Sequence, residues 1–408
     1  MEILFLTPQL PYPPQKGTAL RNWGLISSLA ERHQVSLLSF RSPGQAPRPA
    51  LALTEACARV ETVPQPERST RDRLRDMLTT RRPDMALRLA SEPFARRLTD
   101  WLAREHFDVI HIEGIEMAPY LDAIQTAHPR IVGGTRPLIL FDDHNCEYLL
   151  QKRVCFTDLR TPTRWPGAAY SFVQWRRLRR YEAHVCRRAD CVLAVSDPDA
   201  AALQALSPKL DVTVAPNGID TRSYQPPPSN SQPLTSSLVF TGTMDFRPNV
   251  DAVLWFARRV WPLVRREASD VHFVVVGQRP HPRLDKLRDD PAITLTGRVE
   301  DTRPYIAEAA VYVAPLRMGG GTRLKLLEAM AMGKPVVATR LGAEGYPVAH
   351  GRELLLADTP ADFAAAVAGL LRAPERRDEL GRAGRAFVEE QYDWRVILPQ
   401  VEALYPSA

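Results

Sequence analysis

Residues 311–339 read VYVAPLRMGGGTRLKLLEAMAMGKPVVAT, and this stretch decides the fold. The apolar run Val311–Ala314 predicts a strand, Arg323–Met332 predicts a helix, and Pro335–Thr339 predicts the next strand. Three glycines, Gly319–Gly321, stand before the helix and let the backbone approach a ligand closely. Strand, glycine loop, helix and strand in this order indicate a doubly wound parallel sheet.

The start of that helix is a candidate anion site. We expect Thr322 to be the N-cap, with the free N–H groups of the first turn facing the glycine loop. Arg323 and Lys325 add two cations at the end where a helix dipole disfavours positive charge, so an anionic ligand would explain them. A Walker phosphate loop is excluded, because Lys334 is followed by Pro335 and not by Ser or Thr.

Glu328 lies on the apolar face of the same helix, with Leu324, Leu327 and Ala331. A carboxylate on such a face costs stability unless it has a partner. Two interpretations stay open. Glu328 forms an ion pair with Lys325, three residues earlier, or it accepts a hydrogen bond from a sugar hydroxyl of a nucleotide.

Outward from this stretch, the chain divides into two similar halves. Short apolar runs alternate with helical patterns on both sides of a Pro- and Ser-rich segment, which we interpret as a linker. We therefore predict two Rossmann-like α/β domains facing a cleft, with ligands beyond the carboxyl ends of the strands. The expected boundaries are an N-terminal domain, a linker, a C-terminal domain and a helix that crosses back to the first domain: 1–222, 223–237, 238–386 and 387–408.

Composition sets the class of protein. The chain has 408 residues, 45% hydrophobic and 25% charged, which is an ordinary globular balance and argues against disorder. No apolar run is long enough for a membrane span, and the N-terminus lacks the basic region of a signal peptide. Five scattered cysteines without a CxxC pair favour a reducing cytoplasm over a disulfide framework or a zinc site.

A histidine follows one of the predicted strands in the first half. His144 comes directly after the strand Leu138–Asp142, among acidic and amide side chains. It is either a structural residue or part of an active site, and its place at a strand's carboxyl end favours the second interpretation. Glu113, which ends another strand, is a candidate contact for an acceptor, or it satisfies loop backbone.

These segments together resemble the retaining GT-B glycosyltransferases of family GT4. The resemblance rests on Val311–Thr339 with Gly342-Ala-Glu-Gly345 after it, and on five further segments in matching order. These are Pro14–Thr18, Asp142–Tyr148, Ala215–Asp220, Phe240–Asp245 and Thr296–Val299.

The resemblance implies a set of site residues. His144, Arg323 and Lys325 would be catalytic, and Glu113 and Asn217 would bind the acceptor. The nucleotide-sugar donor would be bound by Gly17, Gly242, Arg247, Arg298, Val299, Gly319, Gly320, Gly321, Thr322 and Glu328. No metal and no separate cofactor are expected, and no Asp-x-Asp motif occurs.

Two departures from the family pattern concern the donor. Glu328 matches the second of two glutamates usually eight positions apart, but the first position holds Gly320. Thr243 stands where an arginine usually follows Gly242. Arg323 and Lys325, with Arg247, are the candidate replacements, as in a GGGTRLK-loop branch found among bacterial polysaccharide-assembly enzymes.

The net charge of +6 suits a phosphate-bearing ligand or an anionic surface. Two basic stretches, residues 68–104 and 175–181, are either solvated helix faces or a peripheral contact with anionic lipid. Nucleic acid is not expected, because acidic residues interrupt the charge and no recognition module occurs.

The sequence thus predicts a cytoplasmic, GT4-like hexosyltransferase at most peripheral to the inner face of a membrane. It would move a sugar, with retention, from a nucleotide-diphosphate sugar to a sugar or lipid-linked acceptor in polysaccharide or glycolipid assembly. The alternatives are a sugar-nucleotide epimerase of the same fold, which needs no acceptor, and a non-catalytic scaffold of a polysaccharide assembly complex.

Overall fold

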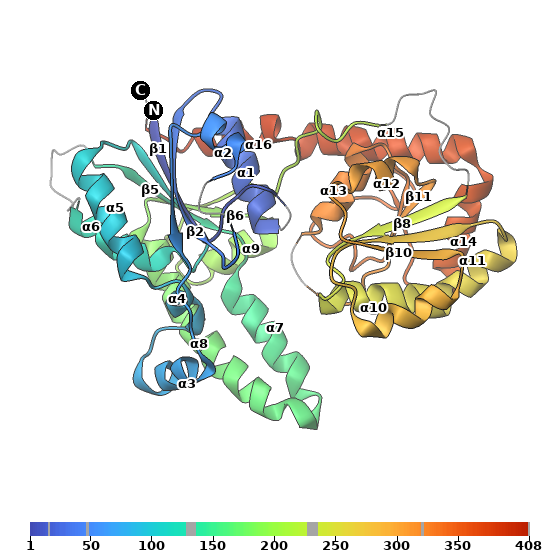
Figure 1. The fold of residues 1–408 in the computed structure, drawn as a ribbon, viewed down its shortest axis with the longest axis horizontal. Coiled ribbons are helices and arrows are strands. Elements are labelled where there is room, and N and C mark those ends of the chain that lie inside the picture. Colours follow the sequence, from blue (N-terminus) through green and yellow to red (C-terminus); the bar gives the residue numbers. More distant parts are fainter. Residues whose placement is uncertain (15–16, 46–48, 128–135, 227–235, 320–321, 407–408) are drawn as a thin grey trace. The chain divides into compact units, whose positions relative to one another are not determined.

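A computed structural model describes residues 1–14, 17–45, 49–127, 136–226, 236–319 and 322–406. The chain forms two compact units, Met1–Pro216 with Ile397–Ala408, and Asn217–Val396. Each is a parallel sheet with helices on both faces, so the prediction of two Rossmann-like domains is confirmed (Figure 1).

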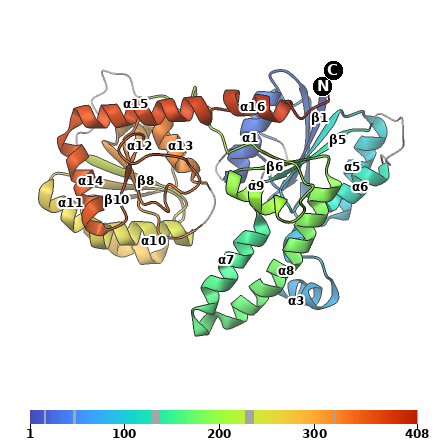
Figure 2. The ribbon, with the colours of Figure 1, turned by 180° about the vertical axis from the view of Figure 1, so that it is seen from behind.

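The first unit has a seven-stranded sheet in the order β3-β2-β1-β4-β5-β6-β7. Its strands are β1 (Glu2–Thr7), β2 (Gln34–Arg41), β3 (Arg59–Pro64), β4 (Val109–Glu113), β5 (Leu138–Asp143), β6 (Cys191–Ala194) and β7 (Val212–Val214). Its helices are α1 (Gly17–Leu29), α2 (Leu51–Ala56), α3 (Thr70–Thr79), α4 (Asp84–Arg88), α5 (Glu92–Arg104), α6 (Leu121–Ala127), α7 (Glu147–Leu159), α8 (Trp165–Arg188) and α9 (Asp197–Gln204). Helices α7 and α8 form a hairpin that extends away from the sheet (Figures 1 and 2).

The second unit has a six-stranded sheet in the order β10-β9-β8-β11-β12-β13. Its strands are β8 (Ser237–Thr241), β9 (His272–Val276), β10 (Ile293–Gly297), β11 (Val311–Ala314), β12 (Val336–Ala338) and β13 (Leu355–Leu356). Its helices are α10 (Arg247–Trp255), α11 (Trp261–Glu267), α12 (Arg303–Glu308), α13 (Leu324–Ala331), α14 (Pro360–Arg372) and α15 (Pro374–Gln391).

Alternate residues of the central strands supply two separate cores, one on each face of the second sheet. Leu238 and Phe240 of β8 pack in one core, while Val239 between them packs in the other with Tyr312 of β11. Burial on both faces explains why these strands appear in the sequence as continuous apolar runs.

The boundaries between the two units differ from those expected. The first unit ends at Pro216 instead of residue 222, and most of the expected linker, residues 227–235, lies outside the described residues. Phe387 and Tyr392 pack in a core of the second unit, so the return to the first unit begins at Ile397, within α16 (Trp394–Glu402), and not at residue 387. These aromatic side chains pack in the same core as Tyr346, whose ring centre lies 5.1 Å from that of Tyr392.

A close backbone contact holds α15 against the end of α13. A Cβ added to Gly381 of α15 would lie 2.0 Å from the carbonyl oxygen of Gly333. We expect Gly381→Ala to lower the free energy of unfolding by about 2–3 kcal/mol, because backbone on both sides must move.

The matched control is Gly369→Ala in α14, where an added Cβ meets nothing within 4 Å. This change should raise the free energy of unfolding by about 0.5–1 kcal/mol, because alanine favours a helix. Chemical denaturation of both variants tests the contact, and equal stabilities would contradict it.

Candidate functional site

Polar groups gather at the carboxyl ends of β4 and β5 in the first unit. Glu113 ends β4 and pairs in register with Asp142 of β5, and His144 follows β5 directly. The turn after β4 needs Gly114, whose φ is 85° and whose added Cβ would lie 3.6 Å from Nδ1 of His144. The turn therefore lets the His144 ring lie close beside the end of β4.

Glu113 is fully buried and accepts hydrogen bonds from two imidazoles. Its Oε2 lies 2.8 Å from Nε2 of His144, and its Oε1 lies 3.2 Å from Nδ1 of His111. Asn22 of α1 donates to Oε2 at 2.9 Å when its amide nitrogen is turned toward the carboxylate. Burial alone would raise the pKa of Glu113, but the two histidines lower it to about 2. The carboxylate is therefore ionised throughout the physiological range.

The charge of Glu113 acts on His144. Burial disfavours the imidazolium, but the hydrogen bond to Glu113 and the charge of Asp142 raise the pKa of His144 above its usual value. Only 11% of the His144 side chain is exposed. Glu113, predicted to contact an acceptor, has no exposed surface in this structure, and its Oε2 bonds to His144.

Two further contacts fix this network from distant parts of the chain. Tyr405, after α16, places its hydroxyl 2.7 Å from Nε2 of His111. Arg21 of α1 donates to both carboxylate oxygens of Asp142, at 2.7 and 2.9 Å. Neither partner was predicted, because each pair is separated by more than 100 residues.

One atom each from Glu113, Asp142 and His144 lies within 4.8 Å of the others, a spacing that a metal ion could use. A cation at this place would have to displace the guanidinium of Arg21, which engages both oxygens of Asp142. The charges of Glu113 and Asp142 are thus already balanced by His144 and Arg21.

In the second unit, the predicted anion site lies at the carboxyl ends of β8 and β11. Gly320 and Gly321 lie outside the described residues. Gly319 has a φ of 106°, and a Cβ there would lie 3.2 Å from Nη2 of Arg323, so the loop passes close to the guanidinium. Arg323 is partly buried, which lowers its pKa, and Glu344 opposes that shift.

Helix α13 begins at Leu324, one residue later than expected, so Thr322 is not its N-cap. The hydroxyl of Thr322 instead accepts a hydrogen bond from Nδ2 of Asn217 at 2.8 Å. A Cβ at Gly345, where φ is 93°, would lie 2.9 Å from the Thr322 methyl carbon. Asn217, expected at an acceptor, thus contacts the glycine loop.

Lys325 points under the turn after β8. Its Nζ donates to the carbonyl of Thr241 at 2.7 Å and to Oδ1 of Asn249 at 2.9 Å, and it lies 4.3 Å from the centre of the Phe240 ring. A Cβ on Gly242 would lie 2.8 Å from this ammonium, so the turn requires glycine there. Burial lowers the pKa of Lys325 to about 7.

Lys325 and Glu328, both described, form no ion pair, so that interpretation of Glu328 is wrong. Glu328 instead accepts a hydrogen bond from the Tyr224 hydroxyl at 3.4 Å. Burial raises the pKa of Glu328, and the charge of Lys325 opposes the rise without a direct contact.

The remaining predicted donor residues lie at the starts of two helices and in the loop after β10. Arg247 is exposed at the first position of α10, and Gly17 is exposed at the first position of α1. Arg298 is exposed after β10, while Val299 packs partly against a core. Asn249 and Tyr224 were not predicted, and no signal in the sequence marks them.

The pair Glu113–His144 gives a direct prediction. Glu113→Gln should lower the pKa of His144, because the amide removes the negative charge that favours the imidazolium. Titration of the His144 ring signals by NMR measures the change. Glu92→Gln, at an exposed pair with Arg96, is the control and should leave the titration of His144 unchanged. An unaltered His144 pKa in Glu113→Gln would contradict the geometry.

Two family models match the chain. Residues 16–223, just over half of it, match the model described as Glycosyltransferase Family 4, and residues 235–373 match Glycosyl transferases group 1. The phosphatidyl-myo-inositol mannosyltransferase of Mycolicibacterium smegmatis is 31% identical over 206 residues, 48% of this chain and 52% of that protein. The MMP alpha-(1->4)-mannosyltransferase of Mycolicibacterium hassiacum is 28% identical over 249 residues, 58% of each chain. The chain thus spans about half the length of the curated relatives it matches.

Solved structures share the fold along nearly the whole chain. Sucrose-phosphate synthase from Thermosynechococcus elongatus has a TM-score of 0.70 at 16% identity and covers 99% of this chain and 98% of its own. Anabaena HepE in complex with UDP has a TM-score of 0.65 at 15% identity and covers 99% of both. With two parallel-sheet domains of the GT-B type and a family model over more than half of its length, the chain belongs to glycosyltransferase family 4.

Proposed function

We propose that the chain is a glycosyltransferase that moves a sugar from a nucleotide-diphosphate sugar to an acceptor, with retention of anomeric configuration. One observation carries the proposal. The glycine loop before α13 brings Arg323 and the partly buried ammonium of Lys325 to the carboxyl ends of β8 and β11. Two cations at the end of a helix that already attracts anions suit a diphosphate.

The leaving nucleoside diphosphate carries concentrated negative charge. Arg323 would contact it through its planar guanidinium, and Lys325 would gain its full charge beside it, since an anion opposes the effect of burial. Groups held in place before the reaction stabilise charge that develops in the transition state. Glu328, one turn further along α13, would hold the ribose hydroxyls, with Tyr224 fixing its orientation. The phosphate charge is met by protein groups, and the proposal requires no metal.

His144 would supply the polar contact to the sugar in the first domain. Its imidazole is held by Glu113, and the small exposed part of the ring is the part available to a hydroxyl. Glu113 holds the His144 ring and is itself held by Asn22, so a hydrogen bond from the ring to a sugar hydroxyl would have a fixed direction. The role of His144 is therefore positioning of the reacting sugar by hydrogen bonding.

The relatives guide the choice of substrate class. Several carry names that specify GDP-mannose dependence and a phosphatidylinositol mannoside, including one from Mycobacterium tuberculosis that is 29% identical over 213 residues. We propose a hexosyl donor and a lipid-linked acceptor, in glycolipid or polysaccharide assembly at the cytoplasmic face of a membrane. Free cysteines at all five positions fit a reducing compartment.

The proposed function is tested first by thermal shift, which measures whether each of a panel of sugar nucleotides stabilises the protein. Release of the nucleoside diphosphate is then measured with and without an acceptor. Stabilisation by one nucleotide class and acceptor-dependent release of the nucleoside diphosphate are expected. Conversion of the donor to an epimer without acceptor would identify an epimerase. Absence of binding by every nucleotide would favour the scaffold.

Arg323 gives the sharpest test of the diphosphate site. Arg323→Ala should lower kcat more than it raises KM, because charge grows on the leaving group in the transition state. Arg323→Lys should recover only part of the loss, since a lysine cannot make the bidentate contact. Steady-state kinetics with the correct donor measure both.

Arg317→Ala is the control for Arg323. Arg317 lies in the same loop but is exposed and paired with Asp251 at 2.9 Å, so its loss should leave kcat within about twofold of the wild type. Wild-type turnover in Arg323→Ala would refute the assignment and move attention to Lys325 and Arg247.

A further inference from the structure

Helix α3 of the first unit leaves Leu74 and Leu78 toward solvent, while Asp76 and Met77 are partly buried. None of its residues is buried, and Leu74 and Leu78 are 56% and 76% exposed. An ordinary surface helix turns its apolar face to the core. In α3 the two leucines face solvent instead.

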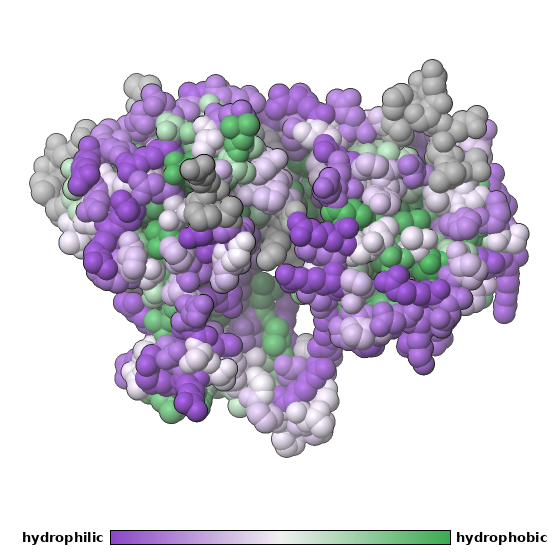
Figure 3. All heavy atoms as spheres, in the orientation of Figure 1, coloured by the Kyte–Doolittle hydropathy of each residue, from purple (hydrophilic) through white to green (hydrophobic). Residues whose placement is uncertain are grey.

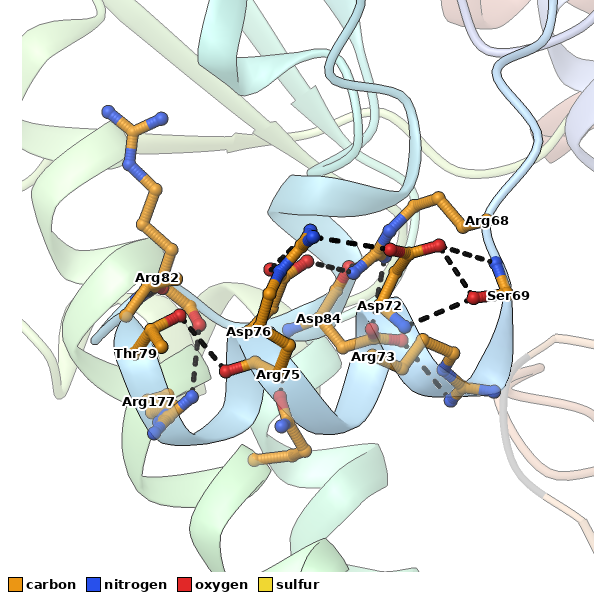
Figure 4. Close-up of polar contacts among 12 residues, drawn as sticks. Arg68, Ser69, Asp72, Arg73, Arg75, Asp76, Thr79, Arg82, Asp84 and Arg177 are labelled. Atoms are coloured by element: carbon orange, nitrogen blue, oxygen red, sulfur yellow. Dashed lines mark hydrogen bonds and ion pairs between the residues drawn. The ribbon is translucent and has the colours of Figure 1, made fainter.

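A network of polar contacts anchors α3 (Figure 4). Arg68 pairs with Asp76 of α3 at 2.8 Å and with Asp84 at 3.1 Å. Arg177 of α8 donates to the carbonyl of Met77 at 2.6 Å, near the end of α3. Arg68 at one end and Arg177 at the other thus hold the helix, and the two leucines remain exposed.

The neighbouring end of the α7–α8 hairpin is also apolar and exposed. Phe156, Leu159, Trp165 and Phe172 are each between 49% and 58% exposed. Helix α3 lies against the hairpin, because Arg73 donates to the Tyr170 hydroxyl at 3.2 Å. In both views α3 and the turn between α7 and α8 lie on the side of the sheet away from the chain termini (Figures 1 and 2). Apolar surface is visible on this part of the unit (Figure 3).

We call the six exposed side chains of α3 and the hairpin the tip surface: Leu74, Leu78, Phe156, Leu159, Trp165 and Phe172. Basic residues outnumber acidic ones in the segments that carry it. Residues 152–165 contain four basic residues and one acidic residue, and residues 68–82 contain six arginines and two aspartates. Among the helices that the structure describes, none is long and apolar enough to cross a bilayer.

We propose that the tip surface docks on an anionic lipid bilayer. Exposed Leu, Phe and Trp side chains would enter the boundary between head groups and acyl chains, and the surrounding Arg and Lys side chains would contact lipid phosphates. Tryptophan at the turn and arginines beside it match the residue types that favour this boundary. This inference concerns a surface apart from the sugar site, and it holds whatever donor the enzyme uses.

Charge favours a bilayer over a second copy of this chain. Two copies meeting through this surface would bring two sets of cations together, which is repulsive, whereas anionic lipid neutralises them. A bilayer also accommodates separate apolar side chains on three helical segments without a matching pocket.

Co-sedimentation with vesicles tests the proposal on the full chain. One set of vesicles contains phosphatidylglycerol mixed with phosphatidylcholine, and the other contains phosphatidylcholine alone. We expect binding to the first set only, and weaker binding as salt is raised. The paired variants Leu74→Ser with Leu78→Ser, and Phe156→Ser with Phe172→Ser, should each weaken binding about tenfold or more. The assay involves no sugar, so its failure would leave the proposed transfer reaction untouched.

The matched control is Leu51→Ser in α2, which removes a leucine that is 72% exposed elsewhere on the same unit. It should bind vesicles like the wild type. All five substituted side chains are exposed, and unchanged melting temperatures would confirm folding. Equal binding by the tip variants, or no preference for anionic vesicles, would overturn the proposal. So would a dimer in sedimentation velocity that the tip variants abolish while vesicles go unbound.

Discussion

Parallel strands covered by helices on both faces leave the strand ends as the place where polar side chains meet. This constraint governs both units of the chain. Along the strands every position must pack, and the side chains of Val239 and Phe240 enter opposite cores. At the last residues of the strands and just beyond them, charged groups such as Glu113 and His144 can meet polar partners. The candidate site residues of each unit are collected there for this reason.

The two units use that position in opposite ways. The first unit buries a negative charge, Glu113, and stabilises it with hydrogen bonds from His111 and His144. The second unit holds a positive charge, Lys325, whose described contacts are a carbonyl and an amide oxygen, and no carboxylate. An anion would complete the second arrangement, while the carboxylate of the first already has its hydrogen-bond donors. The difference supports the proposal that one unit binds the diphosphate and the other positions the sugar.

Much of the fold was predictable because buried strands are continuous apolar runs. Strand β3 was missed, since it lies at the sheet edge and its sequence RVETVP mixes charged and apolar residues. The α7–α8 hairpin was missed as well, because its helices pack largely on each other and many of their exposed positions are arginine. The return to the first unit was placed about ten residues early, because the aromatic residues Phe387 and Tyr392 have a core of their own in the second unit.

The site was predictable only in part. Residue types near strand ends indicated His144 and Glu113, and charge at the start of a helix indicated Lys325, but no pattern indicated their partners. Tyr405 meets His111 across 294 residues, and no local pattern encodes such a contact. One of the two interpretations of Glu328, an ion pair with Lys325, had the correct helical spacing. The lysine side chain instead donates to the carbonyl of Thr241, and Glu328 accepts from Tyr224.

The most direct measurement of the central claim is proton uptake when a nucleoside diphosphate binds. At pH 8, Lys325 is mostly neutral, because its pKa is about 7. A diphosphate beside it should raise that pKa and draw in up to about one proton, seen by titration calorimetry in two buffers of different ionisation enthalpy. Lys325→Met should abolish the uptake. Binding without proton uptake in the wild type, or equal uptake in Lys325→Met, would contradict the account.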